Sequence, residues 1–190
     1  MENYKYSQKW FFGSEIIHKL LDFVDSSKIN KILEIGCFEG ISSVFFADNL
    51  LNNIESKLIC VDPFLTINNN DHQIFFNNPV EQNFDYNIAH SKNSSKITVN
   101  KIISDKFFEK NIDMFNFIYI DGCHQLDYIE RDMKNSFAVL ENNGIMWMDD
   151  YRGGNGDGTI KQTMDKVLEA LSGRYEVIHI GYQLAIRKLY

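Results

Sequence analysis

The sequence lacks a long hydrophobic run, a cysteine framework and a cluster of basic residues. Because no apolar stretch is long enough to span a bilayer, we expect no transmembrane helix and no membrane partner. The N-terminal residues contain no apolar segment of the kind found in secretory signals. The three cysteines occur singly, without a C-x-x-C pair, which favours reduced thiols and a cytoplasmic location. A net charge of −7, with no basic run longer than two residues, disfavours a nucleic-acid partner.

Short apolar runs alternate with helical patterns along the chain. Strands are expected at residues 31–35, 58–62, 96–103, 115–121 and 144–150, with a hairpin around Gly181 at 175–189. Helices are expected at 13–25, with Ser14 as the N-cap, and at 41–52, 80–91, 125–141 and 159–172. This alternation predicts an α/β fold with a mainly parallel sheet. Since no linker-like segment interrupts the pattern, we expect a single domain over residues 1–190.

The first predicted strand ends in a glycine turn, within the sequence KILEIGCFEGISS at 31–43. A strand, a tight turn and a helix N-terminus in this order are typical of a site for a nucleotide-like ligand. The GxxxG spacing of Gly36 and Gly40 fits neither the dinucleotide fingerprint GxGxxG nor a phosphate loop ending in GK[ST]. A ligand with one ribose fits better, because Asp62 after the second strand can accept both ribose hydroxyls. Glu34 is expected to orient the turn or to face an ammonium group.

At these residues the sequence resembles the class I S-adenosylmethionine (SAM)-dependent methyltransferases. The resemblance rests on ExGxxxG at 34–40, on Asp62 and on the C-terminal hairpin, and it covers nearly the whole chain. It implies a Rossmann-like, doubly wound sheet of seven strands with helices on both faces and an antiparallel last strand. It also implies that SAM is bound by the following residues: Glu34, Gly36, Phe38, Gly40, Ser42, Asp62, Ser104 and Asp121.

Three carboxylates follow the fourth and fifth predicted strands. Asp121 ends the fourth strand in IDGCH, and Asp149 and Asp150 end the fifth in MDDY. Ligands of open α/β sheets bind outside the carboxyl ends of the strands, so we expect these acids at one rim. Carboxylates this close repel one another unless a proton or a cation lies between them, and oxygen ligands suit Mg²⁺, Ca²⁺ or Mn²⁺. The alternative is that some of them are helix caps or ion-pair partners.

The acids narrow the resemblance to the metal-dependent small-molecule O-methyltransferases. Asp-Gly-x-His at 121–124 with Asp-Asp at 149–150 is especially similar to the bacterial enzymes that methylate sugar hydroxyls of macrolides and related glycans. The catechol O-methyltransferases share this layout, but they usually have Asn and Lys where this chain has Asp150 and His124. The resemblance implies that Asp121, Asp149 and Asp150 bind a divalent ion, with Mg²⁺ expected. It also implies that Asp121 and His124 are catalytic and that His124 is the general base.

Other functions remain open from the sequence alone. A metal-independent small-molecule methyltransferase would use the acids structurally, and a non-catalytic SAM-binding module would not need His124. A nicotinamide oxidoreductase is disfavoured because the middle glycine of the fingerprint is missing. A sugar-like acceptor is expected to contact residues 1–12, 64–79 and 152–160, and the glycine-rich part of the last segment is interpreted as a lid edge or a solvated connection. The short chain is also consistent with a homodimer in which a second subunit completes the site.

Overall fold

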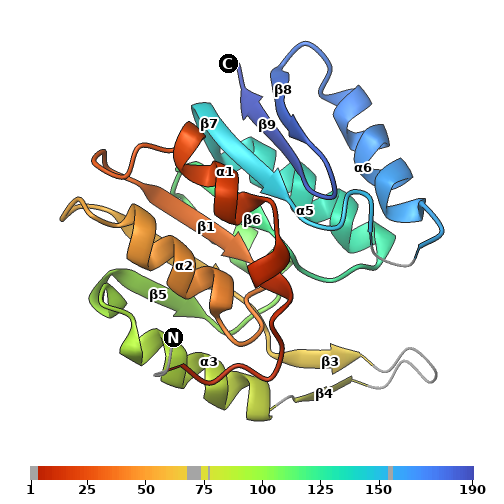
Figure 1. Ribbon diagram of the computed structural model, residues 1–190. Helices are drawn as coiled ribbons and strands as arrows, with labels where there is room; N and C mark the ends of the chain where they lie inside the picture. The colour runs from red at the N-terminus through yellow and green to blue at the C-terminus, as the bar shows by residue number, and fades with distance from the viewer. Residues whose placement is uncertain (1–3, 68–73, 77, 154–155) are drawn as a thin grey trace.

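A seven-stranded sheet forms the centre of the protein, in the order β5-β2-β1-β6-β7-β9-β8 (Figure 1). The structure is a computed structural model, and it describes residues 4–67, 74–76, 78–153 and 156–190. Strand β9 is antiparallel to both of its neighbours, whereas the other pairs in this sheet are parallel. The expected α/β fold, mainly parallel with an antiparallel last strand, is therefore confirmed. The strands of the sheet are β1 Lys31–Ile35, β2 Lys57–Val61, β5 Ile97–Asn100, β6 Phe115–Ile120, β7 Leu140–Met148, β8 Tyr175–Ile180 and β9 Leu184–Lys188.

Helices cover both faces of the sheet, as Figure 1 shows with α2 in front of the strands and α5 behind them. Buried residues of α1, α2 and α3 belong to one core, and those of α4, α5 and α6 belong to the other. The helices are η1 Trp10–Gly13, α1 Ile16–Phe23, α2 Ile41–Leu50, α3 Asn78–His90, η2 Ser94–Lys96, α4 Ser104–Phe108, α5 Leu126–Val139 and α6 Thr159–Ala170. Within the described ranges, none of these helices is long and apolar enough to cross a membrane.

The inner strands β2, β1, β6, β7 and β9 are largely buried on both sides, because successive residues point to opposite helical layers. In β1, Ile32 packs in the core beneath α1 and α2, and the next residue, Leu33, packs in the core beneath α5. In β7, Trp147 likewise packs in the core beneath α1 and α2, and Met146 packs in the core beneath α5. Strands buried on both faces lose the alternation of polar and apolar residues. This packing explains why the predicted strands consist of nearly continuous apolar runs.

Several local predictions differ from the structure. Helix α1 begins at Ile16, and the hydroxyl of Ser14 donates to the carbonyl of Phe11, so Ser14 is not the N-cap. The N–H of Ile16 donates instead to Oε1 of Gln183, at 2.9 Å, and this acceptor is 167 positions away in the sequence. Strand β7 begins before the expected residue 144. The segment 64–79, expected to be irregular, contains two short strands that pair antiparallel apart from the main sheet, β3 Leu65–Ile67 and β4 Ile74–Phe76.

The turn after β1 lies directly against the loop after β6. The N–H of Asp121 donates to the carbonyl of Ile35, at 2.8 Å, and the N–H of Gly36 donates to the carbonyl of Val61, at 2.9 Å. Gly36 has a φ of +82°, and a β-carbon at this position would lie 2.0 Å from the carbonyl oxygen of Asp121. Only glycine leaves room for this approach, which brings the predicted cofactor turn to the predicted acids.

Replacing Gly36 by alanine should destabilise the fold more than replacing Gly173 by alanine. Both glycines have a positive φ, +82° and +79°, so both variants carry the cost of a left-handed alanine, about 1–2 kcal/mol. At Gly36 the added methyl group also overlaps Asp121, and overpacking adds about 1–3 kcal/mol. Urea denaturation measures the two losses of unfolding free energy. Equal losses would contradict the close approach at Gly36.

Candidate active site

Two cavities open at the carboxyl edge of the sheet. The larger, of about 690 Å³, lies between the N-terminal segment and the loops after β1, β6 and β7. The smaller, of about 540 Å³, lies between the loops after β1, β2, β5 and β6. Both volumes fall within the range of small-molecule sites, roughly 300–1,000 Å³. Gly36, Phe38, Asp121 and His124 line both cavities, so the two meet at these residues.

Asp62 holds the glycine turn in place from the end of β2. Its Oδ2 accepts the backbone N–H groups of Cys37 and Phe38, at 2.8 and 3.1 Å, and its Oδ1 accepts that of Phe64, at 2.7 Å. Asp62 also lines the smaller cavity. These three backbone donors occupy part of the carboxylate, which offers about four acceptor positions. The binding of ribose hydroxyls by Asp62 stays a prediction.

The other residues predicted to bind the cofactor divide between the cavity walls and the layer beneath them. Ser42 lines the larger cavity and Ser104 lines the smaller. Glu34 is completely buried and accepts a hydrogen bond from the Ser42 hydroxyl, and burial raises its pKa to about 7. A β-carbon at Gly40 would lie 3.0 Å from the ring of Phe84 in α3. Glu34 and Gly40 therefore support the turn from beneath.

The N-terminal segment forms one side of the larger cavity and is held by two buried polar side chains. The N–H of Lys5 donates to Oδ1 of Asn87, at 2.7 Å, and Nδ2 of Asn87 donates to the carbonyl of Lys5, at 2.8 Å. The N–H of Ser7 donates to Oε2 of Glu39, at 2.5 Å. In Figure 1 this segment, coloured dark red, passes α3 and then the carboxyl end of β1. Since Glu39 belongs to the glycine turn, the turn itself anchors the segment.

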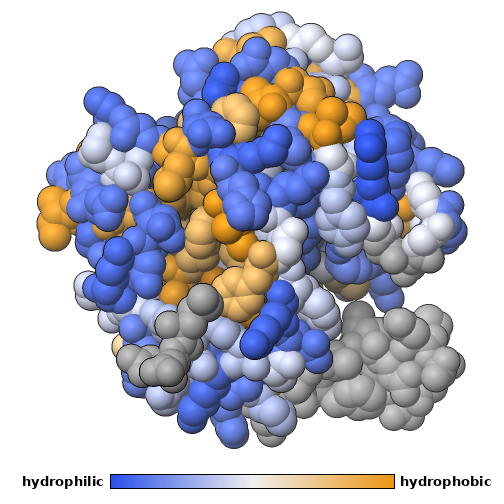
Figure 2. All heavy atoms as spheres, viewed as in Figure 1, coloured by the Kyte–Doolittle hydropathy of each residue, from blue (hydrophilic) through white to orange (hydrophobic). Residues whose placement is uncertain are grey.

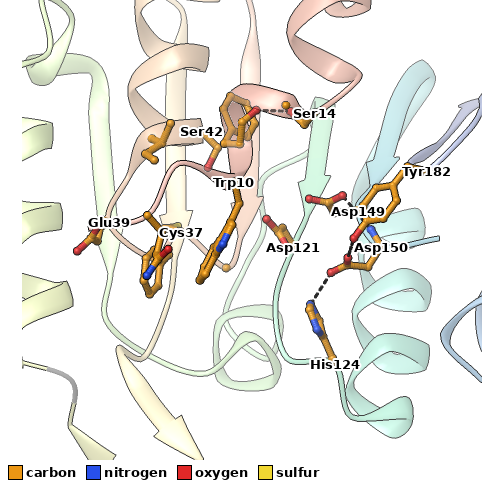
Figure 3. A pocket seen from close by; sticks show the side chains of 16 residues that line it. Trp10, Ser14, Cys37, Glu39, Ser42, Asp121, His124, Asp149, Asp150 and Tyr182 are labelled. Atoms are coloured by element: carbon orange, nitrogen blue, oxygen red, sulfur yellow. Dashed lines mark hydrogen bonds and ion pairs between the residues drawn. The ribbon is translucent and has the colours of Figure 1, made fainter. Parts of the chain in front are cut away.

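Aromatic residues form the wall that faces the acids. Trp10 is 71% exposed, and its ring centre lies 5.3 Å from that of Phe38. Figure 3 shows Trp10 on one side of the cavity and the acids on the other. Figure 2 shows hydrophobic side chains gathered near the middle of this face of the molecule, among hydrophilic ones. The larger cavity thus combines a polar, acidic wall with an aromatic wall.

Asp121 lies where the two cavities meet, in surroundings that disfavour its negative charge. Burial raises its pKa well above the usual range, and the negative charges of Asp149 and Asp150 raise it further. The Tyr119 hydroxyl lies 3.4 Å from Asp121 and donates to Asp149 at 2.9 Å. Burial and the same acids raise the pKa of Tyr119 as well, so it stays a donor. Asp121 therefore favours a bound proton or a nearby cation.

His124 and Asp150 form an ion pair at the edge of the larger cavity (Figure 3). Nε2 of His124 lies 2.8 Å from Oδ2 of Asp150, and this hydrogen bond is the main cause that raises the pKa of His124. The Tyr182 hydroxyl donates to Oδ1 of the same carboxylate. Asp121, His124 and Asp150 each offer one ligand atom, and these atoms lie within 4.8 Å of one another. The three side chains are therefore close enough to hold a metal ion.

Asp149 lines the same cavity but has a different set of partners. Its Oδ1 accepts Nε2 of Gln183 at 3.0 Å and the N–H of Asp150 at 2.9 Å, and its Oδ2 accepts Tyr119. The negative charge of Asp149 still raises the pKa of Asp121. The acids and the histidine predicted from the sequence are thus gathered at one cavity. Which of them bind a metal, and which act in catalysis, stays a prediction.

Tyr182, Gln183 and Glu39 are among the residues of the site that were not predicted from the sequence. Tyr182 and Gln183 lie in the turn between β8 and β9, and their acidic partners are 32 and 34 positions away in the sequence. Glu39 lies within ExGxxxG, at a position that the motif leaves unspecified. No local pattern marks any of the three. Of the segments expected to contact an acceptor, residues 1–3, 68–73, 77, 154 and 155 lie outside the described residues.

Comparisons with known proteins agree with this architecture. A family model described as a methyltransferase domain matches residues 33–151. No protein of curated function matches the chain in sequence. Among solved structures, one from Clostridium thermocellum with a provisional rRNA-methylase assignment has a TM-score of 0.70 at 12% identity, covering 92% of this chain and 93% of its own.

Two solved O-methyltransferases are also similar in fold. TomG of Streptomyces achromogenes, which takes part in tomaymycin synthesis and was solved with SAM, has a TM-score of 0.64 at 14% identity, covering 92% of this chain and 78% of its own. An enzyme from Bacillus cereus, solved with S-adenosylhomocysteine (SAH), has a TM-score of 0.67 at 12% identity, covering 100% and 85%. At these identities the likeness concerns the fold.

Replacing Asp150 by asparagine should lower the pKa of His124 in the metal-free protein. The hydrogen bond from Asp150 is the main cause of the raised pKa, whereas Asp149 contributes only through its charge. The change Asp149→Asn should therefore lower the pKa of His124 less than Asp150→Asn does. NMR titration of the His124 ring protons in the presence of EDTA measures both effects.

The same ion pair makes stability depend on pH. Because the pKa of His124 is higher in the folded than in the unfolded chain, the pair stabilises the fold below the unfolded value, about 6.5. This contribution to the free energy of unfolding is lost as the pH rises through the pKa of His124 in the folded protein.

In the NMR titration, an unchanged pKa of His124 in the Asp150→Asn protein would contradict the ion pair.

Proposed function

The chain belongs to the methyltransferase-domain family, and on this basis we propose that it is a SAM-dependent O-methyltransferase of small molecules. The proposed acceptor is a hydroxyl group of a sugar or glycosylated metabolite, with a divalent cation and with His124 as general base. The observation that carries the proposal is the meeting of two cavities at Asp121 and His124. A donor in one cavity and an acceptor in the other would meet beside a candidate base.

The smaller cavity suits the adenosine part of SAM. Asp62 and Ser104 contribute polar groups to its wall, and Pro63 and Phe64 contribute apolar surface. The SAM in TomG and the SAH in the Bacillus cereus enzyme support the same class of ligand in this chain. SAM supplies a methyl group that is activated by its positively charged sulfur. The turn at Gly36 would bring the methionine part past Asp121 into the larger cavity, where it would approach Ser42.

The acids fit a divalent cation. Asp121 is half-buried beside two further carboxylates, and the negative charges of Asp149 and Asp150 raise its pKa, which supports a positive partner at this place. Carboxylate oxygens are the ligands that Mg²⁺ prefers, so Asp121, Asp149 and Asp150 would hold the ion. When bound, such an ion lowers the pKa of a coordinated hydroxyl group. The chain's own contribution would be to hold three carboxylates together, with Asp121 where the two cavities meet and with Asp149 and Asp150 in the wall of the larger cavity.

His124 is suited to remove the proton from the acceptor hydroxyl. Its side chain is 46% exposed and lines both cavities, so it can reach a substrate in either. Asp150 binds Nε2 and stabilises the protonated ring that forms when the proton is taken up. Because the base must be neutral at the start, turnover should rise with pH through the pKa of His124. Positioning of the two substrates supplies the rest of the rate acceleration.

The aromatic wall of the larger cavity suits a ring-shaped acceptor. The exposed face of Trp10, supported by Phe38, can contact the C–H groups on one side of a sugar ring. The hydroxyl groups at the edge of that ring would then reach His124. The net charge of −7 does not favour an RNA acceptor.

A metal-independent methyltransferase is the second candidate. It is supported by the ion pair of His124 and Asp150, because a histidine held by a carboxylate can act as a general base without a metal. In that case Asp121 and Asp149 would serve the cofactor or the fold. The effect of Mg²⁺ on the protein separates the two candidates.

SAH should stabilise the protein against heat, and the change His124→Gln should leave this effect intact. At 100 times its Kd, SAH adds about 2.7 kcal/mol, which raises Tm by about 5–10 °C for a chain of this size. Loss of a general base lowers kcat by about 10²–10⁴. Thermal unfolding and turnover of sugar acceptors measure the two effects. Undiminished turnover in the His124→Gln variant would exclude His124 as the general base. A wild-type protein that does not respond to SAH would exclude SAM as the methyl donor.

Mg²⁺ should stabilise the wild-type protein at pH 8 and leave Asp121→Asn unaffected. Because the pKa of Asp121 is raised in the folded protein, its negative charge costs stability above the unfolded pKa, about 3.9. Asparagine removes this cost, so the variant should have a higher Tm than the wild type in EDTA. Thermal unfolding in EDTA and in Mg²⁺ tests both effects. A wild type that does not respond to Mg²⁺ would favour the metal-independent candidate.

A further inference from the structure

We propose that the turn between β8 and β9 positions the acids of the site, with Gln183 orienting Asp149 and Tyr182 orienting Asp150. The inference rests on the proposed function, because it assigns these two residues to the support of the metal-binding carboxylates. Neither residue belongs to a motif of the sequence. They are adjacent in the chain, and each donates a hydrogen bond to a different one of two adjacent acids.

Gln183 has a single possible orientation. It is completely buried, and its Oε1 accepts the N–H of Ile16 at 2.9 Å and the indole N–H of Trp147 at 3.0 Å. Two donors face this atom, so it must be the oxygen of the amide. The NH₂ group therefore faces Asp149 and donates to its Oδ1 at 3.0 Å. The core of the protein thus determines the direction of a donor to the active site.

Asp149 is held in one position as a result. Gln183 and the N–H of Asp150 both donate to Oδ1, and Tyr119 donates to Oδ2. These bonds fix the plane of the carboxylate beside Asp121. Without Gln183, Oδ1 would keep only the backbone donor of Asp150, and the carboxylate would be held less firmly, by this donor and Tyr119.

Tyr182 holds Asp150 from the opposite side to His124. Its hydroxyl donates to Oδ1, while His124 binds Oδ2 at 2.8 Å. Its carbonyl also accepts the N–H of Arg152, at 3.0 Å. A β-carbon at Gly153 would lie 2.1 Å from the Tyr182 hydroxyl oxygen, so glycine at this position lets the ring reach the acid. This contact gives the first part of the glycine-rich segment after the acids a structural role.

The turn is itself anchored to the N-terminal part of the chain. Glu15 accepts the N–H of Gln183 at 2.9 Å and pairs with His179 at 2.8 Å. A β-carbon at Gly181 would lie 2.2 Å from the carboxylate of Glu15, so the turn packs tightly on this residue. The positioning residues therefore lie on a rigid support, which precise orientation of ligand groups requires.

Hydrogen bonds to coordinating carboxylates affect metal affinity directly. Removing such an outer partner typically lowers affinity by about 10–100-fold. The change Tyr182→Phe removes one hydroxyl group and keeps the ring, and Gln183→Met removes the donor to Asp149. Tyr190→Phe is a matched control, because the Tyr190 hydroxyl donates to the carbonyl of Gly173, outside the site.

The experiment is a titration with Mn²⁺, without SAM or acceptor, in which electron paramagnetic resonance reports the free ion. Tyr182→Phe and Gln183→Met should weaken binding at least tenfold, with Tyr190→Phe unchanged. Thermal unfolding in EDTA reports any purely structural effect, and if Gln183→Met does not fold, Tyr182→Phe alone decides. Wild-type affinity in Tyr182→Phe would overturn the inference. If the wild type itself binds no Mn²⁺, the metal in the proposed function fails and the inference fails with it, which the wild-type titration alone reveals.

Discussion

The close approach of Gly36 to the backbone of Asp121 determines where the ligand-binding groups lie. A β-carbon at position 36 would be 2.0 Å from the Asp121 carbonyl oxygen, so the turn after β1 and the loop after β6 are in direct contact. The same backbone pairing continues along the carboxyl edge of the sheet. The N–H of Asp121 donates to the carbonyl of Ile35 at 2.8 Å, and the N–H of Asp149 donates to the carbonyl of Ile120 at 2.9 Å. The first residues after three neighbouring strands therefore emerge side by side. The turn and the acids meet because the parallel sheet keeps this register.

The site concentrates negative charge and compensates each carboxylate in a different way. Asp62 accepts three backbone N–H groups, and Asp150 is paired with His124. Glu34 is buried and accepts the Ser42 hydroxyl, and burial raises its pKa to about 7, which favours a bound proton. Asp121 has the least compensation, since burial and the neighbouring acids all raise its pKa. The cost of negative charge therefore falls on Asp121 more than on the other acids of the cluster.

Local spacing was sufficient to predict the central strands and the residues that follow them. An apolar run that stops at Gly36, Asp62 or Asp121 marks a strand end, and the parallel sheet brings such ends together. Contacts between distant parts of the chain could not be predicted in this way. Serine is a common N-cap residue, so Ser14 was predicted to accept a hydrogen bond at the start of α1. The buried amide of Gln183, in the C-terminal hairpin, accepts the N–H of Ile16 instead. The bounds of β7 and the presence of β3 and β4 likewise depend on tertiary packing, which no local pattern records.

Asp149 and Asp150 are adjacent, and in an extended strand adjacent side chains point to opposite faces of the sheet. The chain resolves this conflict at Asp150, whose φ of 55° lies in the left-handed region. That conformation costs most residues other than glycine about 1–2 kcal/mol, and Asp adopts it more readily than most because its short polar side chain can form hydrogen bonds nearby. Bonds from Tyr182 and His124 to the side chain, and from the Gly153 N–H to the backbone carbonyl at 3.1 Å, offset this cost. Glycine would make the same turn without strain but would bring no carboxylate to His124 and Tyr182.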